Sequence, residues 1–245
     1  MNRNLPALSL CLLFLLFFSV AKAQDTYQPG HAILNDGTRV SGTIILYERS
    51  PWVNQQFIWL KDSAAVAANP NGKVKPKKYK VADLKYYQVG ERKFDKVHFV
   101  ELDDLHFKTL GSNNHMLERL SYGRITSYRY YSYPPDMDVF TGSAEEYEEK
   151  KTNQLLAGYK VLAIKDNNGK FKDALNDDPK AYFEDTPEVL QKYLIGDYGN
   201  EPAPAKKGLG AKMMAMARKA TFKAKEADGI VAAFNDYNSK NPVKQ

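Results

Sequence analysis

Apolar and polar residues follow two different periods along the chain. Residues 30 to 61 favour the period of two that is typical of β-strands, and residues 79 to 133 are rich in aromatic and β-branched residues. From residue 143 onward the apolar positions mostly recur at helical spacing. The pattern predicts an α+β protein with an antiparallel β-rich N-terminal part, built as a meander, a sandwich or a small barrel, packed with C-terminal helices.

A β-hairpin is expected first. Asp36 and Gly37 suit the positive φ angles of a two-residue turn, and such a turn pairs Ile33 with Val40. Alternation along the second strand then turns one set of residues toward the core: Val40, Ile44 and Leu46.

The next strand is expected at Gln56 to Lys61, where Phe57 and Trp59 alternate with Ile58 and Leu60. Apolar groups on both faces indicate a strand that is covered on both sides. The stretch from residue 64 to residue 78 combines prolines, asparagines and a glycine with four lysines, which is typical of a solvated loop. Its lysines either contact an acidic partner or keep the loop tip soluble.

Strands of a meander are expected from Tyr79 to Tyr133, separated at Gly90, at residues 103–104 and at residues 111–114. The last of these strands is rich in tyrosine. Alternation places Tyr128 and Tyr130 on one face of the strand and Tyr131 and Tyr133 on the other. A tyrosine-lined face is a candidate surface for stacking on sugars or peptides, and half-buried core is the alternative.

Helices dominate after Pro134. Ser143 with Glu146 forms a capping box, and Gly158 is a suitable stop. A second hairpin is expected within residues 159–172, then a short helical piece, and then a helix that begins after Thr186 and ends at Gly196.

A basic segment ends the chain. Residues 201–210 have the composition of a linker, and residues 211–225 predict a basic amphipathic helix. We expect Asp228 and Gly229 to interrupt it before a final helix docks on the body, so that residues 211–245 form one C-terminal unit. The first helix is a candidate for contact with an anionic membrane surface, and a solvated connector is the alternative. Its contact residues would be Lys212, Arg218, Lys219, Lys223 and Lys225.

The first 23 residues predict a signal peptide. Arg3 precedes an uncharged apolar run that is shorter than a spanning helix, and small residues around Lys22 place the cleavage between Ala23 and Gln24. We therefore expect export, to the periplasm or beyond, with an uncleaved anchor helix as the alternative. Cys11 lies inside the apolar run after a leucine, which argues against a lipid anchor.

Composition changes this picture in two ways. Cleavage would leave 222 residues without cysteine, which excludes thiol catalysis and cysteine-bound metal. The formal charge of +6 is concentrated near the C-terminus, and the remainder of the mature chain is slightly acidic. Since an exported chain rarely meets nucleic acid and no recognition motif is present, nucleic acid is not an expected partner.

Residues for catalysis do not stand out. The four histidines are spaced too irregularly for a zinc pattern, and the motifs of phosphate loops, dinucleotide sites and nucleophile elbows are absent. We therefore assign no catalytic, metal-binding or cofactor-binding residues and expect no cofactor. Paired carboxylates that hydrolyse glycosides lie far apart in sequence, so the residues leave that chemistry open.

Four short motifs and a terminal Tyr-Asn pair are spread over the mature chain. Their residues are Asp36, Gly37, Gly42, Thr43 and Ile44; Tyr79, Asp83 and Leu84; Leu120, Gly123, Arg124, Ile125 and Tyr128; Phe183, Asp185, Pro187 and Val189; and finally Tyr237 and Asn238. In these residues the chain resembles uncharacterised exported proteins of the Bacteroidetes type. The resemblance covers most of the mature chain, implies an envelope location and supplies no activity.

The sequence thus predicts a leader (1–23), a β-rich part (24–135), a part with a helix, a hairpin and short helices (136–200), a linker (201–210) and the C-terminal unit (211–245). The function that fits is an exported, non-enzymatic envelope protein that binds an envelope protein or a glycan. The alternative is a secreted hydrolase with a carboxylate or histidine site between sheet and helices.

Overall fold

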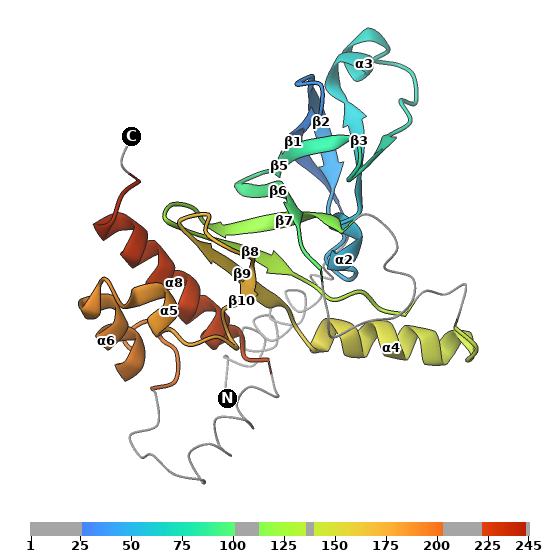
Figure 1. Ribbon diagram of the computed structural model, residues 1–245. Coiled ribbons are helices and arrows are strands. Elements are labelled where there is room, and N and C mark those ends of the chain that lie inside the picture. The colour runs from blue at the N-terminus through green and yellow to red at the C-terminus, as the bar shows by residue number, and fades with distance from the viewer. Residues whose placement is uncertain (1–25, 101–112, 136–139, 203–221, 244–245) are drawn as a thin grey trace, which may run out of the picture.

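The computed structural model describes residues 26–100, 113–135, 140–202 and 222–243, and they confirm an α+β fold (Figure 1). One ten-stranded antiparallel sheet runs in the order β10-β9-β8-β7-β6-β5-β1-β2-β3-β4. Its strands are β1 (Tyr27–Leu34), β2 (Arg39–Ile45), β3 (Phe57–Asp62), β4 (Lys77–Lys80), β5 (Leu84–Val89), β6 (Arg92–His98), β7 (Asn114–Ser121), β8 (Ile125–Tyr130), β9 (Lys160–Lys165) and β10 (Lys172–Asp173). The helices are α2 (Pro51–Asn54), α3 (Ser63–Ala68), α4 (Ala144–Leu156), α5 (Lys180–Phe183), α6 (Pro187–Ile195) and α8 (Ala224–Lys240).

The sheet consists of two meanders joined side by side. Strands β1 to β4 run to one edge, strands β5 to β10 run to the other, and β1 pairs with β5 where the meanders meet. The expected meander is confirmed for the described strands, but its last stretch forms the hairpin β7–β8 instead of one strand. The separation predicted at residues 103–104 lies outside the described residues. A closed barrel is not formed, because β4 pairs only with β3 among the described strands.

The first hairpin forms with a different register from the expected one. The Leu34 N–H donates to the Thr38 carbonyl at 2.9 Å, which leaves a three-residue loop with Gly37 at φ +87°. Ile33 therefore faces Arg39, and the predicted pairing of Ile33 with Val40 is wrong. Three-residue hairpin loops often have glycine in the left-handed region at their last position, so Asp36 and Gly37 suit this loop as well as the two-residue turn.

The core face of β2 is nevertheless as predicted. Ile44 and Leu46 are buried, and Val40 packs against the same cluster. Alternation within a strand does not depend on which partner it faces, so the wrong register left this prediction intact.

Two clusters lie on one face of the sheet and a third lies on the other. The N-terminal cluster gathers residues of β1 to β7, including Tyr87 stacked on Phe94 at 4.2 Å between ring centroids. The C-terminal cluster fills the space between β8, β9 and the helices α5, α6 and α8. Helix α8 contributes a fully buried stripe, which confirms that it docks on the body: Ala227, Ile230, Ala233, Phe234 and Tyr237.

Helix α8 continues through Asp228 and Gly229, where the sequence predicted an interruption. A Cβ atom on Gly229 would lie 2.7 Å from the Asn200 Cβ atom, so the glycine permits close approach of the helix to the preceding loop. Packing of Ala227 and Ile230 on the sheet outweighs the weak helix propensity of glycine, which costs about 1 kcal/mol.

The predicted loop from residue 64 to residue 78 is partly wrong. Residues 63–68 form α3, whose first turn is capped by the Asp62 carboxylate accepting from the Ala64 N–H at 2.8 Å. The last two residues of the range, Lys77 and Lys78, belong to β4.

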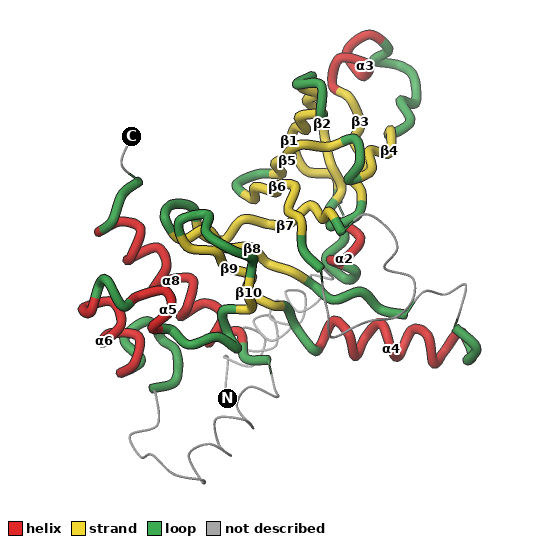
Figure 2. The backbone as a smooth tube through the Cα atoms, in the orientation of Figure 1, coloured by secondary structure: helices red, strands yellow, loops and turns green. Residues whose placement is uncertain are grey.

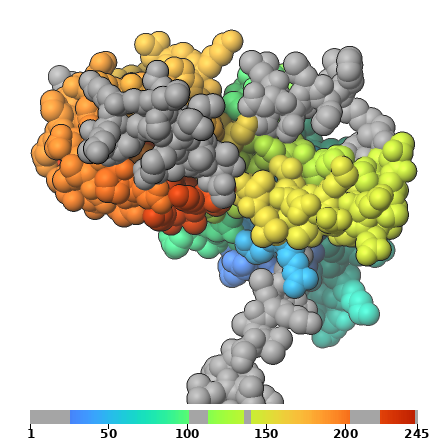
Figure 3. Space-filling view, turned by 90° about the horizontal axis from the view of Figure 1, so that it is seen from below, coloured from blue at the N-terminus to red at the C-terminus, as the bar shows by residue number. Residues whose placement is uncertain are grey.

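Most of the predicted local structure after Pro134 is confirmed. Helix α4 begins with the capping box of Ser143 and Glu146, and the hairpin β9–β10 and the helices α5 and α6 lie where expected. Gly196 adopts φ +87° at the end of α6. Helix α4 buries none of its residues, and Figure 3 shows it lying open on the surface.

Candidate functional site

One cross-strand row connects the aromatic residues of β3 with the lysines of β4. Trp59 faces Lys78 on β4 and Ile45 on β2, and Ile45 faces Tyr27 on β1. Directly opposed residues in a sheet share a face, so this row crosses four strands on one surface. Figure 2 shows the four strands side by side at one end of the sheet. The opposite face of β3 is turned into the core.

Lysine amines lie over the rings of this surface. The Lys78 Nζ atom is 3.6 Å from the Phe57 ring centroid and 5.8 Å from that of Trp59, and the Lys61 Nζ atom is 4.9 Å from the Tyr27 centroid. Phe57 and Trp59 meet edge to face at 6.5 Å. Such cation–π contacts hold the amines beside the rings. We call this surface the basic aromatic face: Tyr27, Phe57, Trp59, Lys61, Lys78 and Lys80.

The basic aromatic face is electropositive. Within the described ranges, its lysines form no ion pair, and the same holds for the neighbouring Lys73, Lys75 and Lys77. The acids nearest to these lysines in sequence accept hydrogen bonds from backbone N–H groups: Asp62 caps α3, and Asp83 accepts from the Lys80 N–H at 2.9 Å. Positive charge on this surface is therefore available to an anionic partner.

Sequence reasoning missed this surface, although it noted both of its parts. The interpretation of β3 as a strand covered on both sides is wrong, since Phe57 and Trp59 are only half-buried and carry amines on their outer side. The lysines 77 and 78 were assigned to a loop, and only the pairing of β4 with β3 brings them beside the rings. The signal was a strand with aromatic residues at alternate positions, followed by a lysine-rich segment.

The four candidate tyrosines lie mainly in the core. Tyr128 is 8% exposed and Tyr130 is 2% exposed, so these two rings support the core interpretation and not a stacking surface. The predicted alternation ends with β8 at Tyr130, and Tyr133 packs on the same cluster as Tyr130, at 6.3 Å between centroids. Tyr131 is half-buried beside Tyr159 at 5.6 Å.

The candidate basic residues near the C-terminus are only partly described. Lys212, Arg218 and Lys219 lie outside the described residues. Lys223 precedes α8 and Lys225 lies in its first turn, and both Nζ atoms are 2.9 Å from the Glu201 carboxylate. Hydrogen bonds from these two lysines lower the pKa of Glu201 to about 2. The two described cations of the set are thus paired within the chain.

Two carboxylates on opposite faces of the sheet are held by arginines. Glu118 accepts from Arg92 Nε at 2.9 Å and from Arg129 Nη1 at 3.0 Å. It lies on the face of the sheet that carries the N-terminal and the C-terminal cluster. On the other face, Asp95 accepts both bonds of the Arg119 guanidinium at 2.6 Å.

Two further groups that could serve in acid–base chemistry are also engaged. The Tyr128 hydroxyl donates to Asp95 at 3.1 Å, and burial together with the Asp95 charge raises the pKa of Tyr128. Both ring nitrogens of His115 have partners, the Tyr133 hydroxyl at 2.8 Å and the Phe99 carbonyl at 3.1 Å. These groups have structural partners that explain their positions.

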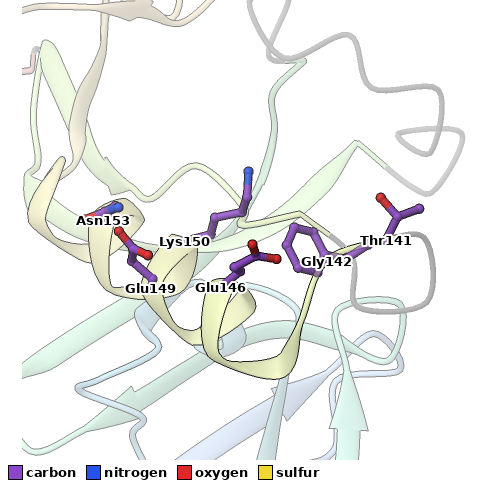
Figure 4. Close-up of a pocket in the computed structure, with 7 residues that line it drawn as sticks. Thr141, Gly142, Glu146, Glu149, Lys150 and Asn153 are labelled. Carbon is purple, nitrogen blue, oxygen red and sulfur yellow. The ribbon is translucent and has the colours of Figure 1, made fainter.

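A shallow groove of about 480 Å³ lies beside α4 (Figure 4). Glu146, Glu149 and Lys150 project into it from the helix, and Phe140 and Thr141 line it from the preceding segment. Glu146 is held by its capping hydrogen bond from the Ser143 N–H at 2.7 Å, and Lys150 Nζ lies 5.4 Å from the Phe140 centroid. The groove carries no convergent set of reactive groups.

In the parts of the chain that the structure describes, no three His, Cys, Asp or Glu side chains gather closely enough to hold a metal ion. None of the described helices has the length and apolar run needed to cross a bilayer. Comparisons of the chain with protein-family models, with curated proteins and with solved structures found no match.

Proposed function

We propose that the mature chain is an exported, non-enzymatic binding module of the cell envelope and that the basic aromatic face is its binding surface. The proposed location rests on the leader, with its cation, its short apolar run and its small-residue end. The resemblance to exported Bacteroidetes-type proteins points to the same compartment.

The observation that carries the binding role is that the lysines of the basic aromatic face lie beside half-buried rings and form no ion pair with any described residue. Like charges on neighbouring positions of one surface repel each other, and an anionic ligand relieves this repulsion on binding. Aromatic rings beside the amines add an apolar contact area with a defined orientation. A surface of this kind suits a partner that has both negative charge and a flat apolar face.

The polar clusters of the described residues also favour binding over hydrolysis. A hydrolase uses a carboxylate or histidine that can reach its substrate. Glu118 and Asp95 are each held by arginine side chains, and His115 is bonded through both ring nitrogens. These interactions account for the groups as parts of the fold.

Two measurements test the proposal. Mass spectrometry of the chain from an envelope fraction should give Gln24 as its first residue. The purified mature chain should sediment with isolated envelope material, and the double variant Lys61→Gln with Lys78→Gln should sediment with it less, since the variant removes two cations from the basic aromatic face.

Lys150→Gln provides the matched control. Lys150 is an exposed lysine that also lies beside a ring, but it belongs to α4 at a distance from the basic aromatic face. Equal losses in the control and the double variant would overturn the role of this surface. A chain that keeps Met1 in a cytosolic fraction would overturn the location.

A further inference from the structure

We infer that the ligand of the basic aromatic face is an acidic polysaccharide, an inference that rests on the proposed binding function and names its ligand class. Three features of the described residues select this class: the outer edge of β4 offers little to a peptide strand, the aromatic residues sit on strands whose spacing suits linked sugars, and the rings of the face are at most 38% exposed.

The edge of β4 is nearly closed to strand addition. The Val81 N–H donates to the carbonyl of Gln56, the residue before β3, at 2.8 Å, so alternation turns the backbone N–H and C=O of Lys78 and Lys80 toward the outer edge. The outward N–H and C=O of Lys80 are already bonded to Asp83, at 2.9 Å each. Pro76, the next outward position, has no N–H. An extended peptide would therefore find only Lys78 with both backbone groups facing the edge.

The aromatic residues stand at a useful backbone separation. Trp59 and Tyr27 belong to the same cross-strand row, and their backbone positions lie two strands apart, which corresponds to roughly 10 Å at the usual strand spacing. This separation is comparable with the length of a disaccharide. The apolar face of a sugar packs on an aromatic ring, and a carboxylate on the sugar reaches the adjacent amine of Lys61 or Lys78.

The same surface is poorly suited to a lipid bilayer. Phe57 and Trp59 are half-buried in the sheet, and Tyr27, the most exposed ring of the face, is 38% exposed. Peripheral proteins that enter a bilayer present apolar side chains that reach below the headgroups. The basic aromatic face instead presents half-buried rings, two of which stand edge to face, with lysine amines beside them.

Polygalacturonate serves as the probe, with dextran as the neutral comparison. We expect the mature chain to bind polygalacturonate in isothermal titration calorimetry or affinity electrophoresis and to leave dextran unbound. Lys78→Gln should weaken binding by about threefold to tenfold, as the loss of one charge-assisted contact implies. Trp59→Ala should weaken it by a similar factor through the lost stacking.

Lys150→Gln again serves as the control and should bind like the unchanged chain. Trp59 contributes to packing, so its variant is first compared with the parent by circular dichroism. Lys78 is exposed, and its variant tests the inference even where Trp59→Ala does not fold.

Several results would overturn the inference. Equal binding of polyglutamate would mean that charge alone is recognised, and stronger binding of anionic vesicles or single-stranded DNA would assign the surface to another ligand. Absence of polygalacturonate binding would mean that the lysines only prevent the exposed edge strand from pairing with other chains. If the chain still sediments with envelope material through the basic aromatic face, the proposed function stands and only the ligand class fails.

Discussion

The side-chain amide of Asn238 makes two hydrogen bonds to the backbone of Ile125. Its Oδ1 atom accepts from the Ile125 N–H at 2.9 Å, and its Nδ2 atom donates to the Ile125 carbonyl at 2.7 Å. Asn238 lies in α8 and Ile125 begins β8, at the end of the hairpin where pairing with β7 becomes irregular. The amide thus takes the place of a neighbouring strand and fixes the helix against the sheet.

The same arrangement of two hydrogen bonds from one side-chain amide recurs between Gln55 and Tyr131. Gln55 accepts from the Tyr131 N–H at 2.7 Å and donates to the Tyr131 carbonyl at 2.8 Å. Gln55 follows α2 and is buried. Side-chain amides therefore supply hydrogen bonds to backbone groups at the start of β8 and at the residue that follows it.

Asn238→Ala should lower the free energy of unfolding by about 1–3 kcal/mol, because it leaves the Ile125 N–H without its partner, whereas the Ile125 carbonyl keeps the hydrogen bond from the Ser121 hydroxyl at 3.2 Å. Urea denaturation of the purified mature chain measures the change. Asn153→Ala on the exposed side of α4 is the control, and we expect it to change stability by less than about 0.5 kcal/mol. Equal stabilities of the two variants would show that the Asn238 amide contributes nothing measurable.

Gly229→Ala should destabilise the protein even though alanine is the better helix former. The added Cβ would lie 2.7 Å from the Asn200 Cβ atom, closer than packed carbons approach. Strain of this kind costs about 1–3 kcal/mol, which exceeds the gain of about 1 kcal/mol in helix propensity. Thermal melts give the result, and Asp228→Ala at the exposed neighbouring position should be neutral or stabilising.

The sequence allowed the class of each element to be predicted better than its limits. Alternation identified β2 and its core residues Ile44 and Leu46, and the capping box located α4. The prediction of an interruption at Gly229 was wrong because helix propensity is a local property, whereas α8 is held by its buried stripe and by contact with Asn200. The hairpin register was wrong because Asp36 and Gly37 suit loops of two lengths.

The basic aromatic face could not be assembled from sequence because its residues come from three strands, β1, β3 and β4, which β2 joins. Trp59 and Lys78 are opposite each other only through the pairing of β3 with β4, and Tyr27 joins the row through β2. The strand period of two indicates which residues share a face within one strand, but it does not give the order of the strands. The tyrosines that did stand out, such as Tyr130, were conspicuous because they form core.

Asp185 should give the folded chain a measurable acid sensitivity. Burial raises the pKa of Asp185. Hydrogen bonds from Lys165 and Tyr237, both at 2.8 Å, and the charges of Lys165 and Arg124 together lower it by more than burial raises it, so the pKa lies below its usual value. A lowered folded-state pKa contributes stability above the unfolded-state pKa, and this contribution is lost as the pH falls through the folded-state pKa.

The measurement compares Asp185→Asn with the parent chain. Between about pH 5 and pH 3 the parent should lose more stability to urea than the variant, because the variant has no carboxylate to protonate at this position. Other carboxylates titrate in both proteins and cancel in the difference. Identical pH profiles for parent and variant would contradict the assigned role of Asp185.

Glu201→Gln should strengthen binding to anionic vesicles if residues 211–225 contact a membrane surface, which is our proposal for this segment. Glu201 pairs with Lys223 and Lys225, so its neutralisation releases two cations at the end of the segment. Each released lysine should raise vesicle affinity by about fivefold at low salt. Sedimentation with phosphatidylglycerol vesicles measures the gain.

Glu188→Gln is the matched control for this prediction. Glu188 also pairs with two lysines, Lys192 at 3.2 Å and Lys240 at 2.8 Å, but these belong to α6 and to the far end of α8. An equal gain in both variants would mean that vesicle binding follows net charge and not the segment. Substitutions are preferable to deleting the basic segment together with the start of α8, since such a deletion would also remove Ala227 from the C-terminal cluster. In the Glu201→Gln background, replacing Lys212, Arg218 and Lys219 with glutamine should abolish the gain, and a gain that persists would contradict the proposed membrane contact.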